Sequence, residues 1–221
     1  MKFEPNFSHL GGGHPLNSRH SRPGVAFYDI VIIGIIIVVL ALSMVATQFS
    51  RVVVSGSSMN PTLVNGQVIL AREPRRIRRG DIVTFHWRRD IPHAEVGCGH
   101  DMIKRVVAVG GDTIRFESYR RVARLYLMVA GSNEFLLQEE RFLGEPMNAW
   151  NNMPTEPIFV PEGYFFVMGD NRNNSRDSRD MDGVGLVRAD QLLSRQVIAL
   201  TPGGIVARIL LMLGADVEAQ A

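Results

Sequence analysis

The stretch that decides the fold is Asp101–Phe116, with the sequence DMIKRVVAVGGDTIRF. Its first part, Met102–Val109, is rich in β-branched and apolar residues, which is typical of a β-strand. Gly110, Gly111 and Asp112 then supply a turn, and a second strand is predicted over Thr113–Phe116. Two strands joined by a tight turn favour a β domain.

Working outward, the rest of the chain repeats this pattern of short strands broken by Gly, Pro, Asn and Asp. Further strands are predicted over Arg51–Val54, Val68–Ala71, Asp81–Trp87, Tyr119–Val129, Tyr164–Met168 and Gln196–Leu200. Neither an internal repeat nor a helical period is seen outside one apolar run near the N-terminus. The sequence therefore predicts a mainly β domain over residues 51–202.

Two parts of this region have less regular patterns. Residues 117–157 are rich in charge, Pro and Asn, and we interpret them as an inserted β-ribbon or loop region. Residues 203–221 form a tail whose apolar run, Ile205–Leu213, is too short to span a bilayer. That run is expected either to lie on a membrane surface or to pack on the core.

The N-terminal apolar run, Ile30–Phe49, carries no charged side chain. Twenty helical residues rise ~30 Å, about the thickness of a hydrocarbon core, so a membrane-spanning anchor is predicted. A cleaved signal peptide has a shorter apolar core, and charge-free runs of this length are uncommon in the buried helices of soluble domains. Residues 1–29 are predicted to be a flexible tail, which the positive-inside tendency would keep in the cytoplasm.

Composition excludes other classes of protein. Of the 221 residues, 46% are hydrophobic and 21% are charged, which excludes general disorder. The 24 Lys and Arg residues nearly balance 22 acidic residues, so no nucleic-acid partner is expected. Cys98 is the only cysteine, and no internal disulfide can form.

Lys104 lies on one face of its predicted strand with Met102, Val106 and Ala108. Burial on an apolar face disfavours the charged ammonium and lowers its pKa, and a neutral amine can take a proton from a serine hydroxyl. The alternative is an edge strand from which the lysine reaches water.

Ser58 lies in the sequence Ser55–Leu63, SGSSMNPTL, directly after the anchor and one short strand. Gly56 permits unusual backbone angles and Pro61 fixes the chain beyond. Such a turn can present a hydroxyl together with backbone N–H groups, as acyl transfer requires. A Ser-rich linker is the alternative interpretation.

The polar loop Gly169–Arg179 follows the predicted strand Tyr164–Met168. It is interpreted as support for a catalytic lysine, as a solvated surface loop, or as a calcium loop. The glycine of an EF-hand is replaced by Arg176, which disfavours calcium.

Four stretches, in order, resemble type I signal peptidase. They are Ser58–Leu63, Gly80–Phe85, Lys104–Val107 with Gly111 and Asp112, and Gly169–Arg179. The resemblance implies a β-rich signal-peptidase fold with one N-terminal transmembrane helix and a Ser–Lys dyad, a variant of the serine-protease constellation. It also implies removal of signal peptides from exported preproteins at Ala-x-Ala-like sites.

Residue by residue, the resemblance makes Ser58, rather than Ser57, the nucleophile and Lys104 the general base. Ser175 would hydrogen-bond the lysine, while Asp177 and Arg179 would brace the site around Arg105. The substrate groove would be lined by Val52, Val54 and Ile103.

The sequence departs from the family pattern at two positions. Gly56 stands where many Gram-negative members have a serine that assists the oxyanion hole, and Asn173 stands where the family usually has Asp. With Gly56, the oxyanion would depend on backbone N–H groups.

The resemblance implies preproteins and a lipid bilayer as partners, and no cofactor is expected. The sequence does not determine the oligomeric state, for which a monomer is the expectation. The resemblance places the chain in a bacterial inner membrane, with one span and the catalytic domain on the periplasmic face. His86, His93, Cys98 and His100 fit no standard zinc spacing, so no metal is expected. The basic run Arg75–Arg79 is interpreted as a solvated face or a contact for anionic lipid.

Three other functions remain open from the sequence. They are a self-cleaving Ser–Lys protein of the LexA type, a catalytically silent membrane scaffold, and an organelle-membrane processing peptidase.

Overall fold

The computed structural model describes residues 23–87, 100–149, 153–201, 203–206, 208 and 217–220. It divides into two compact units, Met1–Met44 and Val45–Ala221. Each unit is described by itself.

The first unit contains one helix, α1 (Pro23–Ala46). Pro23 occupies its first position, where the fixed φ of proline suits a helix and no N–H is needed. Within α1, the 19 residues Phe27–Val45 have a mean hydropathy of 2.7 and none of them is buried. The helix is therefore long and apolar enough to span a membrane, as the sequence predicts.

The prediction of a flexible tail over residues 1–29 is wrong for its last part. Residues 23–29 are already helical, and residues 1–22 lie outside the described part of the chain. A single charge such as Asp29 near the start of an apolar helix does not end it, because its carboxylate can be solvated at the helix terminus.

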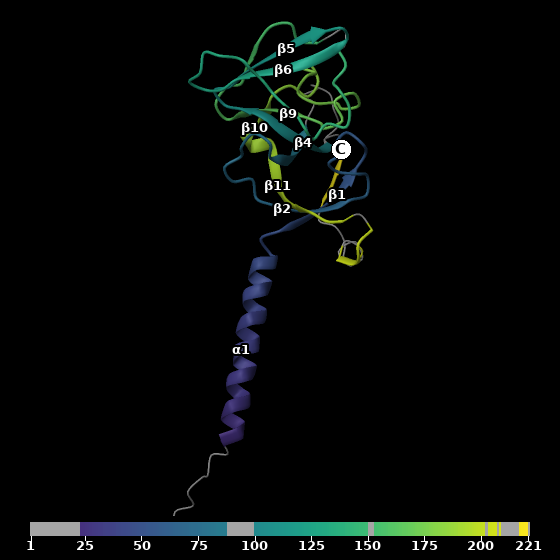
Figure 1. Cartoon of the computed structure of the whole chain (residues 1–221). Coiled ribbons are helices and arrows are strands. Elements are labelled where there is room, and N and C mark those ends of the chain that lie inside the picture. The colour runs from purple at the N-terminus through teal and green to yellow at the C-terminus, as the bar shows by residue number, and fades with distance from the viewer. Residues whose placement is uncertain are drawn as a thin grey trace, which may run out of the picture. The chain divides into compact units, whose positions relative to one another are not determined.

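The second unit consists of two β-sheets, which confirms the mainly β prediction (Figure 1). The larger sheet has eight strands in the order β10-β9-β4-β12-β1-β2-β11-β3. They are β1 (Ser50–Ser55), β2 (Val68–Arg72), β3 (Ile82–Trp87), β4 (His100–Val109), β9 (Tyr164–Met168), β10 (Val187–Arg188), β11 (Leu192–Ala199) and β12 (Val217–Gln220). A short 3₁₀ helix, η1 (Ala189–Gln191), joins β10 to β11.

An additional pairing between β3 and β4 closes six of these strands into a ring, β4-β12-β1-β2-β11-β3. In this ring β1 and β4 do not pair with each other, because β12 lies between them. The sequence did not predict β12, since alternation over only four residues, Val217–Gln220, is too short to distinguish a strand from a tail. Its strand conformation comes from pairing with two neighbours distant in sequence, which no local signal reveals.

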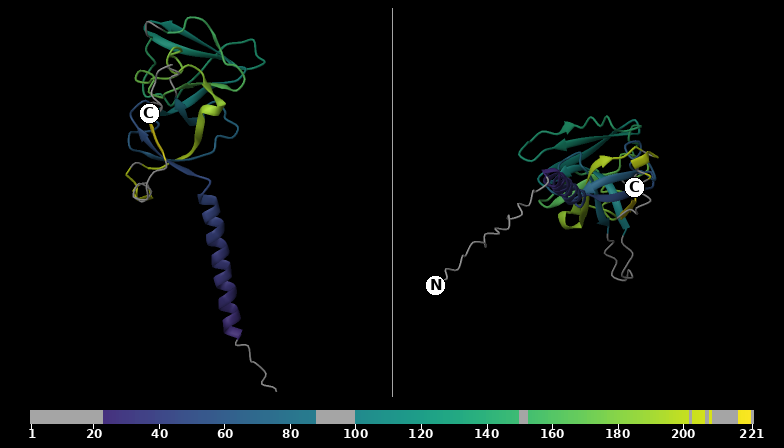
Figure 2. Two further views of the ribbon diagram at one scale, coloured as in Figure 1. Left: turned by 180° about the vertical axis from the view of Figure 1, so that it is seen from behind. Right: turned by 90° about the horizontal axis from the view of Figure 1, so that it is seen from below.

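The smaller sheet has the order β7-β6-β5-β8 and lies beside β4 and β9 (Figures 1 and 2). Its strands are β5 (Thr113–Tyr119), β6 (Val122–Met128), β7 (Leu136–Leu137) and β8 (Ile158–Phe159). A core that includes Phe116, Leu125 and Phe166 packs between the two sheets. The end of β5, together with β6 and β7, places parts of residues 117–157 in this second sheet.

The predicted strand Tyr119–Val129 is wrong at its start. Arg120 and Arg121 adopt φ angles of 49° and 66°, so the chain reverses there. Tyr119 consequently ends β5 and pairs with Val122 across the hairpin.

The turn inside the deciding stretch is fixed by Asp112, which is fully buried. Its carboxylate accepts hydrogen bonds from Val109 N and Ala130 N and pairs with Arg79 at 2.7 Å. Burial alone would raise the pKa of Asp112, but these hydrogen bonds lower it below its usual range. Arg79, whose side chain is 40% exposed, is thus also the ion-pair partner of a buried carboxylate, a contact that its interpretation as part of a solvated face did not include.

Candidate active site

The serine turn begins where β1 ends. Gly56 has φ +99°, in a region that favours glycine, and its N–H donates to Asn65 Oδ1 at 2.8 Å. Beyond it, Met59 and Leu63 are fully buried in one core cluster with residues of β1 and β2. These anchors fix the turn and leave Ser58 only 4% exposed.

Lys104 projects from β4 to the same place. Its side chain is buried, with Nζ 2.7 Å from Ser58 Oγ and 2.9 Å from the carbonyl oxygen of Ile103. The lysine does not reach water, so the edge-strand alternative is wrong. The fold thus brings together two residues that are 46 positions apart in sequence.

The electrostatics of this pair favour proton exchange. Burial lowers the pKa of Lys104 from 10.5 to about 8, an effect that the negative charge of Asp177 partly opposes. At pH 7 about a tenth of the molecules then carry a neutral amine. That amine can donate one N–H to Ile103 and accept the hydroxyl proton of Ser58 on its lone pair.

The polar loop Gly169–Arg179 is held directly against the serine turn. Asn171 N donates to the carbonyl oxygen of Ser58 at 2.8 Å, and Asn171 Nδ2 donates to that of Ser57 at 3.2 Å. The carboxylates of Asp170 and Asp177 in this loop form ion pairs with arginines, which disfavours calcium binding by them. The loop therefore supports the serine turn.

The ion pairs differ from the predicted arrangement around Arg105. Arg105 pairs with Asp170 at 2.6 Å, while Asp177 pairs with Arg179 at 2.7 Å. Asp177 also accepts a hydrogen bond from Gly169 N at 3.0 Å. There are consequently two separate ion pairs, Arg105–Asp170 and Arg179–Asp177. The sequence interpretation did not single out Asp170 as a partner of Arg105.

The predicted hydrogen bond between Ser175 and Lys104 is not formed. Ser175 Oγ is buried and has no hydrogen-bond partner within the described part of the chain. A Cβ added at Gly169 would lie 2.3 Å from Ser175 Oγ and 2.5 Å from the carbonyl oxygen of Ser58. Gly169 is therefore the point of closest approach between the polar loop and the serine turn.

A methyl group at this point has no room, so Gly169→Ala is expected to displace the backbone of Ser58. Overpacking of this kind costs about 1–3 kcal/mol of stability. We expect a lower melting temperature and a fall of about 10- to 100-fold in kcat/KM, since catalytic geometry tolerates little displacement. Peptidase activity and thermal unfolding would be measured together. Gly144→Ala is the matched control, because its Cβ would make only ordinary contacts, 3.4 Å from Pro61; equal losses in both variants would contradict the prediction.

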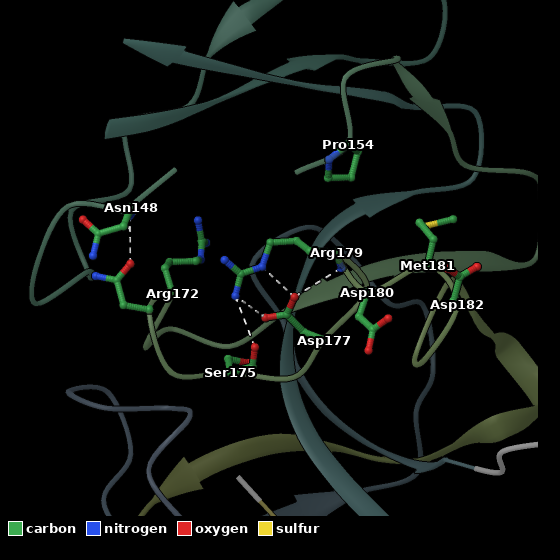
Figure 3. Close-up of a pocket in the computed structure, with 10 residues that line it drawn as sticks. Asn148, Pro154, Arg172, Ser175, Asp177, Arg179, Asp180, Met181 and Asp182 are labelled. Carbon is green, nitrogen blue, oxygen red and sulfur yellow. Dashed lines mark hydrogen bonds and ion pairs between the residues drawn. The ribbon is translucent and has the colours of Figure 1, made fainter. Parts of the chain in front are cut away.

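A cavity of about 700 Å³ adjoins the polar loop (Figure 3). Arg172, Ser175, Asp177 and Arg179 line one side of it, and Asn148 and Pro154 come from the inserted region. Figure 3 shows the guanidinium of Arg179 lying against the carboxylate of Asp177. Ser58 and Lys104 do not line this cavity.

The inserted region is tied to the polar loop through Arg172 and Asn173, whose contacts the sequence did not predict. Arg172 forms an ion pair with Glu140. Asn173 accepts a hydrogen bond from Asn148 N at 2.8 Å and donates to Glu145 Oε1 at 2.8 Å. An aspartate could not make the second bond, so the departure from the family pattern at Asn173 has a local physical reason.

The three residues predicted to line a substrate groove lie in the core cluster that also contains Met59 and Leu63 of the serine turn. Val52, Val54 and Ile103 are all buried, and they belong to one core cluster. Backbone atoms of β1 pair with β12 along this line.

Among the residues described, no group of three or more His, Cys, Asp and Glu side chains lies close enough to hold a metal ion. His86 Nδ1 lies 2.8 Å from Asp101 Oδ1. The other metal-ligand candidates of this region, His93 and Cys98, lie outside the described residues.

Comparison with known proteins agrees with this geometry. The family model described as "Signal peptidase, peptidase S26" matches residues 27–201. Signal peptidase I of Bacillus licheniformis is 35% identical over 157 residues, which cover 69% of this chain and 77% of the relative. Signal peptidase I of Bacillus amyloliquefaciens is 31% identical, with 76% and 82% covered. Thylakoidal processing peptidase 1 of Arabidopsis thaliana is 33% identical over 67% of this chain and 41% of its own length.

The matched region includes the apolar helix, the serine turn, the lysine strand and the polar loop. The chain belongs to the signal peptidase family, peptidase S26, and is a serine endopeptidase.

Proposed function

We propose that this protein removes signal peptides from exported preproteins with Ser58 as nucleophile and Lys104 as general base. The observation that carries the proposal is the 2.7 Å separation of Lys104 Nζ and Ser58 Oγ in a buried setting. Burial keeps a useful fraction of the amine neutral, and the short separation allows direct proton transfer.

The reaction is an acyl transfer in two halves. Lys104 Nζ takes the hydroxyl proton as Ser58 Oγ attacks the scissile carbonyl carbon, and the resulting ammonium gives a proton to the leaving amine. In the second half, the amine takes a proton from water, and the water oxygen attacks the acyl carbon. The bond from that carbon to Ser58 Oγ then breaks, the ammonium returns its proton to Ser58 Oγ, and the cleaved signal peptide is released. The carboxylate of Asp177 favours the ammonium that forms in each half.

Backbone donors would stabilise the oxyanion. Gly56 has no side chain to contribute, and within the described part of the chain no backbone partner engages the N–H of Ser58. That N–H is therefore available to the developing negative charge. Preorganised donors of this kind usually contribute several kcal/mol to the rate.

The strand edges of β1 and β4 beside the dyad suit an extended substrate, and the resemblance favours small side chains at an Ala-x-Ala-like site. We propose that α1 anchors the enzyme in a bacterial inner membrane as a monomer. The catalytic unit would lie on the periplasmic face, in keeping with the excess of Arg and Lys before the span.

The cleavage site of a model preprotein tests this function. Detergent-extracted protein is expected to cut once, directly after the second alanine of an Ala-x-Ala sequence, because the family resemblance implies a preference for small side chains at that site. The products would be mapped by mass spectrometry. A matched preprotein with tryptophan in place of that second alanine should stay intact.

Equal cutting of both substrates would contradict the proposed specificity. If neither preprotein is cut, the silent-scaffold alternative is favoured. If the protein cuts its own chain and neither preprotein, the self-cleaving alternative is favoured.

A further inference from the structure

The strand β12 closes the ring of the larger sheet at an unusual place. It lies between β1, which leads into Ser58, and β4, which carries Lys104. Removing it would leave the facing edges of β1 and β4 without a strand between them. Two strands that flank a third lie about 10 Å apart, which is the space that one extended peptide fills.

The direction of β12 is also informative. It runs parallel to β1, with Val52 opposite Val217 and Ser55 opposite Gln220. It runs parallel to β4 as well, with Met102 opposite Gln220. Ser58 follows Ser55 by three residues and Lys104 follows Met102 by two, so β12 points along both neighbours toward the dyad.

The sequence of this segment matches the substrate class. Val217–Ala221 reads VEAQA, and it contains the pattern Ala-x-Ala at Ala219, Gln220 and Ala221. The last described residue of the strand, Gln220, is the middle residue of that pattern. The first two residues of that pattern, Ala219 and Gln220, thus belong to the strand that lies between β1 and β4.

We propose that the strand Val217–Gln220 is a built-in ligand of the signal-peptide groove, and that a preprotein must displace it before cleavage. This inference rests on the proposed function for the identity of the competing substrate. Strand addition of this kind uses main-chain hydrogen bonds, which any extended peptide can reproduce. The segment therefore lowers the apparent affinity for the substrate without altering the chemical step.

The kinetic test compares the full chain with a variant that lacks residues 217–221. If the strand fills the groove for about nine-tenths of the time, its removal lowers KM about tenfold and leaves kcat unchanged. The free peptide VEAQA should inhibit the shortened enzyme competitively with respect to preprotein. Ala219→Pro, which removes one strand N–H opposite Val54, should reproduce the fall in KM in the full chain.

A second readout does not depend on activity. Val53 lies opposite Glu218, so cysteines in a Val53→Cys, Glu218→Cys variant with Cys98→Ser should form a disulfide under mild oxidation. Peptide mapping would detect it, and a Val53→Cys, Glu117→Cys pair on different sheets is the control.

The results separate this proposal from the proposed function. An unchanged KM in the shortened enzyme, with normal Ser58-dependent cleavage, would overturn the built-in ligand and leave the function intact. Absence of the disulfide would overturn it as well. Failure of both full and shortened chains to cut any preprotein would instead contradict the function, and the disulfide would then decide whether the segment occupies the groove.

Discussion

Replacing Ser58 with alanine is expected to lower kcat/KM for a preprotein by at least about 10⁴-fold. The substitution removes the attacking oxygen, while Met59 and Leu63 still anchor the turn in the core. Folding should therefore be preserved. The measurement is the rate of preprotein processing by purified protein, with the thermal unfolding curve recorded beside it.

The control for this prediction lies one residue earlier. Ser57→Ala removes a hydroxyl that accepts a hydrogen bond from Asn174 Nδ2 at 3.2 Å, well away from Lys104 chemistry. It should retain most of the activity. A Ser58→Ala variant that processes preprotein normally, or a Ser57→Ala variant that is equally inactive, would contradict the assignment of the nucleophile.

Replacing Lys104 with methionine is expected to abolish processing to a similar extent, because the two members of a dyad act as a unit. Met has a similar length but no proton acceptor. In the parent enzyme, kcat/KM should rise with pH through about 8, since the amine becomes active as it loses its proton. Any residual kcat/KM of the variant should not rise with pH in this range.

Replacing Lys104 with methionine is also expected to change how the free energy of unfolding depends on pH. The pKa of Lys104 is about 8 in the folded chain and near 10.5 when unfolded, so the unfolded state binds more protons between these values. Stability of the parent should rise with pH across that window by roughly 3 kcal/mol. Denaturant unfolding of Lys104→Met should lack this increment. Lys104→Arg, which keeps the charge, should be both inactive and less stable.

Most of the strands could be predicted because their signals are local. The alternation around Lys104 predicts β4 and an apolar face, and the glycine and proline around Ser58 predict a turn. That these two features meet is not a local property, and the prediction of it depended on the resemblance to a family. The structure supplies the physical reason, which is the packing of the serine turn against the core beside β4.

What the sequence missed depends on contacts between distant segments. Asp170 resembles any loop carboxylate until Arg105 is seen opposite it. Arg79 belongs to a basic run, and only the fold places buried Asp112 beside it. The strand β12 is too short to be predicted from its own four residues, and it pairs with β1 and β4, which are distant in sequence.

For Ser175, the resemblance implied a contact that the structure does not contain. The resemblance assigned it a hydrogen bond to Lys104, whereas the structure leaves it without a partner among the described residues and gives the electrostatic influence to Asp177. The polar loop therefore acts on the lysine through charge and on the serine turn through Asn171, whose N–H binds the carbonyl oxygen of Ser58.

The central claim is that a buried, readily deprotonated Lys104 activates Ser58. The chain contains only two lysines, Lys2 and Lys104, so lysine labelled with ¹³C at Cε gives two NMR signals whose pH titration can be followed directly. A Lys2→Arg variant assigns them by removing one signal. We predict that the Lys104 signal titrates with a midpoint of about 8. A midpoint at the ordinary lysine value, above about 10, would contradict the account.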